Sequence, residues 1–200
     1  MLTIVVQAGG KSRRMGKDKA LLPFLGKPLI QRVIDRVSLL GREILVITNR
    51  SADYRFLNLP LHADQWPDAG ALGGLATALA VAQEPLVANI ACDMPFVNAD
   101  LIAAGCKVLL ENLETDAFLP MSVYGYEPLH AVYRRETCLQ AVSRALANGR
   151  RRMISWFDEA TIHTFSPEDV QKLDPEMRAF WNLNTPEELE QAEALARSIS

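Results

Sequence analysis

Short apolar runs alternate with amphipathic segments along this chain, and that alternation restricts the fold more than any other feature. The apolar runs predict buried strands at Leu2–Gln7, Glu43–Asn49, Leu59–Asp64, Leu86–Ala91, Asp116–Met121 and Thr161–Phe165. Helical periodicity or composition predicts helices at Pro28–Leu40, Gly74–Gln83, Asn98–Leu113, Glu136–Asn148, Arg151–Glu159 and Pro186–Arg197. The segment Val123–Arg135 has mixed periodicity. Such alternation is typical of an α/β domain with a mostly parallel sheet and helices on both faces.

Length and composition narrow the classes of protein further. Two hundred residues suit one domain, and a net charge of −3 argues against general nucleic-acid binding. The cysteines Cys92, Cys106 and Cys138 fit neither a disulfide framework nor a zinc site, which favours a reducing cytoplasm. The first residues lack the pattern of a signal peptide, and the apolar runs are too short to span a membrane.

The turn after the first predicted strand is rich in glycine and in positive charge. Five of the 21 lysines and arginines fall within nine positions: Lys11, Arg13, Arg14, Lys17 and Lys19. Backbone N–H groups of such a turn can approach phosphates closely. The spacing from Gly10 to Gly16 is not that of a P-loop, and no dinucleotide Gly-x-Gly-x-x-Gly occurs. A polyphosphate site and a solvated basic turn both remain open.

Polar side chains also end four of the predicted strands: Gln7, Asn49, Asp64 and Asp93. Ligands of open α/β sheets bind beyond the carboxyl ends of the strands, so these side chains are expected at one rim. Asp93 there suits either a Mg²⁺ ligand or a cap for the next segment, and Asn49 suits either a base contact or a turn. Cys92 is expected to pack as a small buried residue.

The string "AGGKSRRMGKDKALLPFLGKPLI" (Ala8–Ile30) closely resembles the opening signature of nucleotidyltransferases, and most of all that of the molybdenum cofactor guanylyltransferases. The resemblance continues through "ADQWPDAGALGGLATAL", "ACDMPF", "EPLHAVY" and "NLNTPEEL" and covers nearly the whole chain. It implies a Rossmann-like three-layer α/β/α sandwich of the nucleotide-diphospho-sugar transferase type. It also implies one domain, residues 1–200, with a nucleotide-binding half (1–97) and an acceptor-binding half (98–200).

The resemblance implies a reaction as well. GMP passes from GTP to the phosphate of the molybdopterin cofactor, pyrophosphate leaves, and Mg²⁺ assists. Expected partners are these two substrates, with other cofactor-biosynthesis proteins or molybdoenzyme chaperones beside them, and neither nucleic acid nor membrane. The alternatives are a cytidylyltransferase acting on the same cofactor, another small-acceptor nucleotidyltransferase, and a non-catalytic nucleotide sensor or cofactor-delivery adaptor.

When the motifs of the family are matched to this sequence residue by residue, the resemblance implies a candidate site. The catalytic set is Arg14, Lys19 and Asp93, with Asp93 as the metal ligand. The nucleotide-binding set is Gln7, Ala8, Gly9, Gly10, Lys19, Asn49, Asp64, Gly74 and Asp93. The residues expected near the acceptor are Asn182 and Asn184.

Some positions depart from the family or stay open. Gln7 stands where the family usually has an apolar residue, and Ala71 replaces a proline of its glycine loop (Gly70, Gly73 and Gly74). Asp64 is favoured over Asp68 to read the guanine edge. Glu127 and Arg150–Arg152 either face the acceptor or are surface charges, and His62, His130 and His163 are assigned no role.

Overall fold

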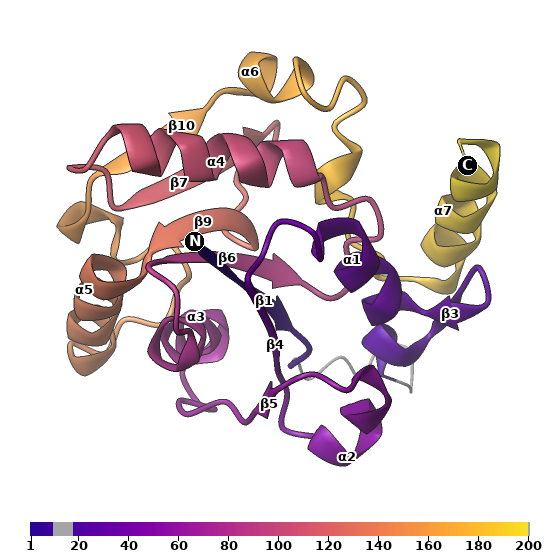
Figure 1. Ribbon diagram of the computed structural model, residues 1–200, viewed down its shortest axis with the longest axis horizontal. Coiled ribbons are helices and arrows are strands. Elements are labelled where there is room, and N and C mark those ends of the chain that lie inside the picture. The colour runs from indigo at the N-terminus through magenta and orange to yellow at the C-terminus, as the bar shows by residue number, and fades with distance from the viewer. Residues whose placement is uncertain (10–17, 200) are drawn as a thin grey trace.

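A computed structural model describes residues 1–9 and 18–199, and its centre is a mixed, mostly parallel sheet (Figure 1). The strands of this sheet follow the order β10-β7-β9-β6-β1-β4-β5, with β8 paired to β7. Their bounds are β1 (Leu2–Gln7), β4 (Glu43–Ile47), β5 (Leu61–His62), β6 (Leu86–Ala91), β7 (Ala117–Ser122), β8 (Gly125–Tyr126), β9 (His130–Arg134) and β10 (Ile162–Phe165). A separate hairpin consists of β2 (Pro23–Phe24) and β3 (Lys27–Pro28).

Helices cover both faces of the sheet. Their bounds are α1 (Leu29–Val37), α2 (Ser51–Tyr54), α3 (Gly70–Val81), α4 (Ala99–Glu111), α5 (Arg135–Ala147), α6 (Pro167–Gln171) and α7 (Pro186–Ser198). One face packs Val5 of β1 with Leu75 of α3 and Val142 of α5, and the other packs Ile4 with residues of α1 and α4. Figure 1 shows the sheet passing between α4 on one side and α3 and α5 on the other. The expected three-layer α/β/α class is confirmed.

Strand direction decides where a site can form. β1 is parallel to both β4 and β6, and β4 is parallel to β5. β9 is antiparallel to both β6 and β7, so β7 runs in the same direction as β6. The carboxyl ends of β1, β4, β5, β6 and β7 therefore share one edge of the sheet.

Several predicted boundaries are wrong. Helix α3 begins at Gly70, four residues before the predicted start, because Gly70 turns the chain into the helix at φ +62. Only a 3-10 turn, Phe157–Glu159, forms within the predicted helix 151–159. Arg150 donates to the Ser155 carbonyl over 2.7 Å and Trp156 is fully buried, so this segment closes as a compact loop. The mixed segment 123–135 contains β8 and β9.

The C-terminal helix begins as its sequence predicts. The Thr185 hydroxyl accepts from the Glu188 N–H over 3.2 Å, the Glu188 carboxylate accepts from the Thr185 N–H over 3.1 Å, and Pro186 occupies the first turn. This capping box sets the point where the preceding Asn182–Asn184 segment ends. Within residues 1–9 and 18–199, no helix has the length and apolar character needed to cross a membrane.

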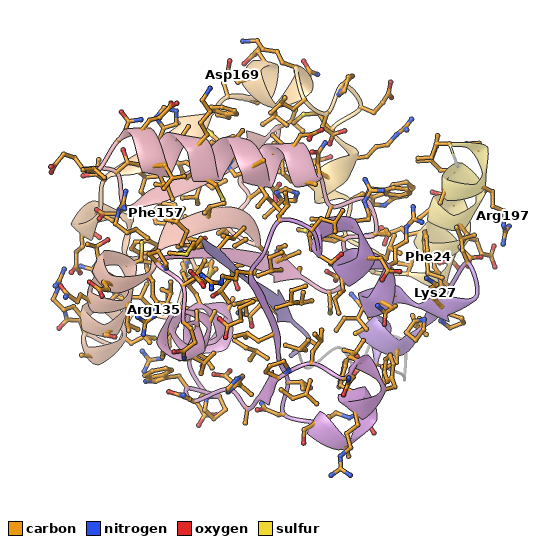
Figure 2. All side chains as sticks on the ribbon, viewed as in Figure 1. Phe24, Lys27, Arg135, Phe157, Asp169 and Arg197 are labelled. Carbon is orange, nitrogen blue, oxygen red and sulfur yellow. The ribbon has the colours of Figure 1, made fainter. Side chains whose placement is uncertain are left out.

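Helix α7 packs against the β2–β3 hairpin, far away in sequence. Figure 2 shows Phe24 and Lys27 of the hairpin next to α7, which carries Arg197. The Leu25 N–H donates to the Glu193 carboxylate over 2.6 Å, and Phe24 packs in one cluster with Phe96 and Ala192. This packing holds the segment after the basic turn, the loop after β6 and the segment before α7 together.

Candidate nucleotide-binding and catalytic site

The polar residues at the strand ends emerge side by side, as their parallel strands require. Gln7 pairs with Ile47 of β4 on one side and with Ala91 of β6 on the other. The Ala8 N–H donates to the Ile47 carbonyl over 2.9 Å, and the Cys92 N–H donates to the Gln7 carbonyl over 3.2 Å. Asn49 and Asp93 each follow two residues after these strands, which puts them on the rim that the sequence predicts.

Asp93, Lys19 and Asn184 meet at the centre of this rim. The Lys19 ammonium lies 3.7 Å from the Asp93 carboxylate and donates a hydrogen bond to Asn184 Oδ1 over 2.7 Å. The side chains of Lys19 and Asp93 are only 13% and 21% exposed. Burial raises the pKa of the Asp93 carboxyl, and the charge of Lys19 acts against that rise. The cluster is thus a partly desolvated charge pair at the edge where an anionic ligand would bind.

Backbone contacts support this cluster from the acceptor half. The Leu183 N–H donates to the Asp93 carbonyl over 3.0 Å, and Asn184 Nδ2 donates to the Asn182 carbonyl over 3.2 Å. Asn182 Nδ2 donates to the Phe180 carbonyl over 3.1 Å. Asn184 therefore orients Lys19, while the Asn182 side chain is engaged by the local backbone.

Asp18 supports the same lysine and was not singled out by the sequence analysis. One of its oxygens accepts from the Ala20 N–H over 3.1 Å and caps the turn that begins with Lys19. The other accepts from the Tyr54 hydroxyl over 2.7 Å and pairs with Arg50 at 3.4 Å. Tyr54 is fully buried, so Asp18 ties the end of the basic turn to α2. In the sequence, the Asp18-Lys19 dipeptide is the feature that points to Asp18, and it does not tell whether Asp18 anchors the lysine or binds a ligand itself.

Asn49 and Asp64 also come together. Asn49 Oδ1 accepts from the Asp64 N–H over 2.9 Å. Asp64 Oδ1 accepts from the Trp66 N–H and from the Thr77 hydroxyl, both over 2.9 Å. This geometry engages one carboxylate oxygen of Asp64 in holding the turn before α3. Asp68 lies exposed in that turn.

Gln7 contacts a buried polar side chain, although the family usually has an apolar residue at this position. Its Nε2 donates to Asn89 Oδ1 over 2.8 Å. Its Oε1 lies 2.7 Å from the place where a Cβ on Gly74 would stand, and a Cβ on Gly73 would stand 2.3 Å from the Trp66 carbonyl. Glycine at position 74 therefore lets the start of α3 approach Gln7 at the end of β1, and glycine at position 73 lets it approach the backbone of Trp66.

The other residues that the sequence singled out either lie outside the described residues, follow β1 directly or make structural contacts. Gly10 and Arg14 lie outside the described residues, whereas Ala8 and Gly9 lie directly after β1. Arg150 pairs with Asp158 at 2.7 Å, and Arg151 donates to the Leu146 carbonyl over 3.1 Å, which are structural contacts. Cys92 is a half-buried thiol whose pKa burial raises, in keeping with packing rather than nucleophilic attack.

The loop after Asp93 is held by a side chain of helix α1 and by a side chain of strand β9. Arg36 of α1 donates to the Val97 carbonyl over 2.8 Å, and the Asn98 N–H donates to His130 Nε2 over 3.0 Å. His130 is buried against Phe180, and burial lowers the pKa of its imidazole to about 4 from 6.5, although the charge of Asp174 acts against that lowering. His130, to which the sequence assigned no role, is therefore neutral, and as an acceptor it holds the far end of the Asp93 loop.

This depressed pKa predicts an acid-sensitive fold. Between pH 6.5 and about pH 4 the unfolded chain protonates at His130 while the folded chain does not, so stability is lost as pH falls through that window. His130→Gln keeps an acceptor for the Asn98 N–H but cannot titrate. We expect urea unfolding at pH 7 and pH 5 to show a smaller loss of stability for the variant. Equal losses would contradict the assignment.

A divalent metal ion fits this set of residues. Mg²⁺ takes one or two carboxylates, with water and substrate phosphates completing its coordination. Asp93 supplies one partly exposed carboxylate, and within the described ranges no group of three or more histidines, cysteines or acids forms a complete protein cage. Such a site would depend on the nucleotide for its other oxygens.

A mostly parallel sheet with a lysine–aspartate pair at its carboxyl edge, in a chain with a glycine-rich and basic sequence after β1, is the arrangement expected of a nucleotidyltransferase. Residues 4–162 match the model of the MobA-like NTP transferase domain. The chain belongs to this family.

Similar proteins carry consistent names. The chain is 34% identical to the molybdenum cofactor guanylyltransferase of Desulfosudis oleivorans (98% of this chain, 96% of the relative). It is 32% identical to that of Vibrio cholerae (96% and 91%). The crystal structure of molybdopterin-guanine dinucleotide biosynthesis protein A from Archaeoglobus fulgidus superposes with a TM-score of 0.82 at 26% identity, covering 98% of this chain and 99% of that one. A cytidylyltransferase from Thermus thermophilus, at 19% identity and a TM-score of 0.69, shares the fold.

Proposed function

We propose that this protein transfers GMP from GTP to the terminal phosphate of molybdopterin and releases pyrophosphate. The observation that carries the proposal is the convergence of Lys19, Asp93 and Asn184 at the carboxyl edge of the sheet. The names of the relatives support GTP as the donor over the cytidylyl alternative. In this proposal, residues 1–97 bind the nucleotide and residues 98–200 bind the acceptor.

The chemistry requires charge neutralisation more than a protein nucleophile. An oxygen of the acceptor phosphate attacks the α-phosphorus of GTP in line, and the bond from that phosphorus to the bridging oxygen of pyrophosphate breaks. The attacking oxygen is already anionic, so no serine or histidine has to be activated. Lys19 stabilises the charge that develops on the α-phosphate, and Asn184 aims its ammonium group.

The remaining roles complete the proposal. The backbone from Ala8 to Arg13 wraps the phosphates, and Arg14 meets the leaving pyrophosphate. Asp93 holds Mg²⁺, which when bound supplies further positive charge beside the phosphates. Gln7, Asn49, Asp64 and Gly74 line the base and ribose, and Asn182 lies toward the acceptor. Cofactor-biosynthesis proteins or molybdoenzyme chaperones would supply the acceptor or receive the product.

A direct assay tests the reaction. The purified chain is incubated with molybdopterin and each of GTP, ATP and CTP, with and without Mg²⁺, and both pyrophosphate and the dinucleotide are measured. We expect both products with GTP and Mg²⁺. Faster formation of the cytosine dinucleotide would favour the cytidylyltransferase alternative. GTP binding without either product would favour the sensor or adaptor.

Base choice gives a sharper prediction at Asp64. Asp64→Asn retains the Oδ1 acceptor for Trp66 and Thr77 but replaces the second oxygen with an amide donor. If that oxygen accepts from guanine, the preference for GTP over ATP in kcat/KM should fall roughly 10-fold or more, the effect of losing a charge-assisted hydrogen bond. Asp68→Asn is the matched control. A loss of selectivity with Asp68→Asn instead would move the base pocket to the exposed turn.

A further inference from the structure

The β7–β8 hairpin leads directly into the chain segment beside the end of β6. Past Phe118, β7 pairs with β8: Met121 pairs with Tyr126, and Ser122 pairs with Gly125. The segment that joins β8 to β9 runs beside the end of β6, because the Ala91 N–H donates to the Leu129 carbonyl over 3.1 Å, and Asp93 follows two residues after Ala91. The β7–β8 hairpin therefore flanks the proposed metal site.

This hairpin exposes an aromatic side chain although its base is anchored. Tyr124 at the tip is 95% exposed, and Val123 beside it is 77% exposed. Tyr126 at the base packs edge-on against Phe157, with ring centroids 5.3 Å apart, and Phe157 packs in turn against the buried Trp156. Phe157 is labelled in Figure 2. An exposed ring on an anchored turn offers a stacking surface at little entropic cost.

A carboxylate, that of Glu127, lies three residues after Tyr124, at the base of the same hairpin. Glu127 is half-buried, its N–H donates to the Pro120 carbonyl over 3.0 Å, and burial raises the pKa of its carboxyl. The Ser122 side chain acts against this rise of the pKa, and its hydroxyl oxygen accepts from the Tyr124 N–H over 3.1 Å. Within residues 1–9 and 18–199, no lysine, arginine or histidine pairs with Glu127. The carboxylate is therefore available to a ligand that donates N–H groups.

We infer that Tyr124 and Glu127 bind the pterin end of the acceptor. The pterin ring stacks on Tyr124, and its N3–H and 2-amino group donate to the Glu127 carboxylate, while the phosphate end of the same molecule extends to Lys19 and Asp93. A planar ring with two adjacent donors matches both features of the hairpin. This inference rests on the proposed function, because it names the part of the acceptor that the hairpin recognises.

The experiment compares acceptor kinetics at saturating GTP and Mg²⁺. Glu127→Gln and Tyr124→Ser should each raise KM for molybdopterin about fivefold or more, with KM for GTP unchanged. Free pterin should inhibit competitively against molybdopterin better than lumazine, which lacks the 2-amino group. Glu127→Gln should abolish that difference, whereas Tyr124→Phe should retain normal KM. Exposed positions at the opposite edge of the sheet, Glu111→Gln and Leu113→Ser, serve as controls.

The outcomes separate this inference from the proposed function. Absence of dinucleotide from the unmodified protein would overturn the proposed function itself. Normal turnover with unchanged KM and unchanged pterin inhibition in both variants would overturn only the role of the hairpin. A variant that keeps its KM for molybdopterin but transfers the product poorly to an apo-molybdoenzyme would also overturn it and would make the hairpin a protein-docking site.

Discussion

Asp93→Asn should lower turnover roughly 10²- to 10³-fold, the largest effect expected of any single substitution in this protein. The amide keeps the shape of the side chain but loses the negative charge that a hard divalent metal requires. The fold should survive, because the Asp93 carbonyl that accepts from the Leu183 N–H belongs to the backbone. Dinucleotide formation is measured across a titration of Mg²⁺, and thermal unfolding is measured alongside.

Asp100→Asn provides a matched control for this substitution. Asp100 lies exposed in the first turn of α4, seven residues beyond Asp93, and should leave turnover nearly unchanged. Near-normal activity of Asp93→Asn at saturating Mg²⁺ would exclude Asp93 as the metal ligand and leave it as a partner of Lys19.

Lys19→Met should reduce kcat about 100-fold while weakening apparent GTP affinity much less. The ammonium is proposed to act on charge that develops during transfer, so its loss should appear mainly in kcat. Methionine preserves most of the side-chain volume in a position that is only 13% exposed. Steady-state kinetics with GTP and molybdopterin varied separately give the two effects.

The structure supplies a control and a second variant for this test. Lys27→Met removes a neighbouring lysine whose pair with Asp35, at 3.0 Å, is largely exposed, and it should change neither constant appreciably. Asn184→Ala removes the acceptor that orients Lys19 and should lower kcat in the same direction, with little further loss when combined with Lys19→Met. An increase confined to KM for GTP would instead make Lys19 a ground-state phosphate anchor.

Elements whose sequence patterns repeat within a few residues could be predicted from the sequence. The strands β1, β4 and β6 lie where their apolar runs predict, and the Thr185–Glu188 box begins α7 as expected. Parallel strands bring their carboxyl ends to one edge, so the placement of Gln7, Asn49 and Asp93 at one rim also followed from local patterns. The start of α3 was harder to predict because every residue from 72 to 79 is buried, which removes the contrast between helix faces.

What the tertiary structure decided was which atoms remain free for a ligand. The sequence alone marks Lys19, Asp93 and Asn184 as candidates, but Lys19 and Asn184 are 165 positions apart and no local period links them. Only packing of α7 on the β2–β3 hairpin brings the two together. In the same way, folding engages one oxygen of Asp64 in a turn and leaves Glu127 without a cation in the described part of the chain. A residue's type and its place on a strand follow from local sequence, whereas its partners depend on contacts between distant segments.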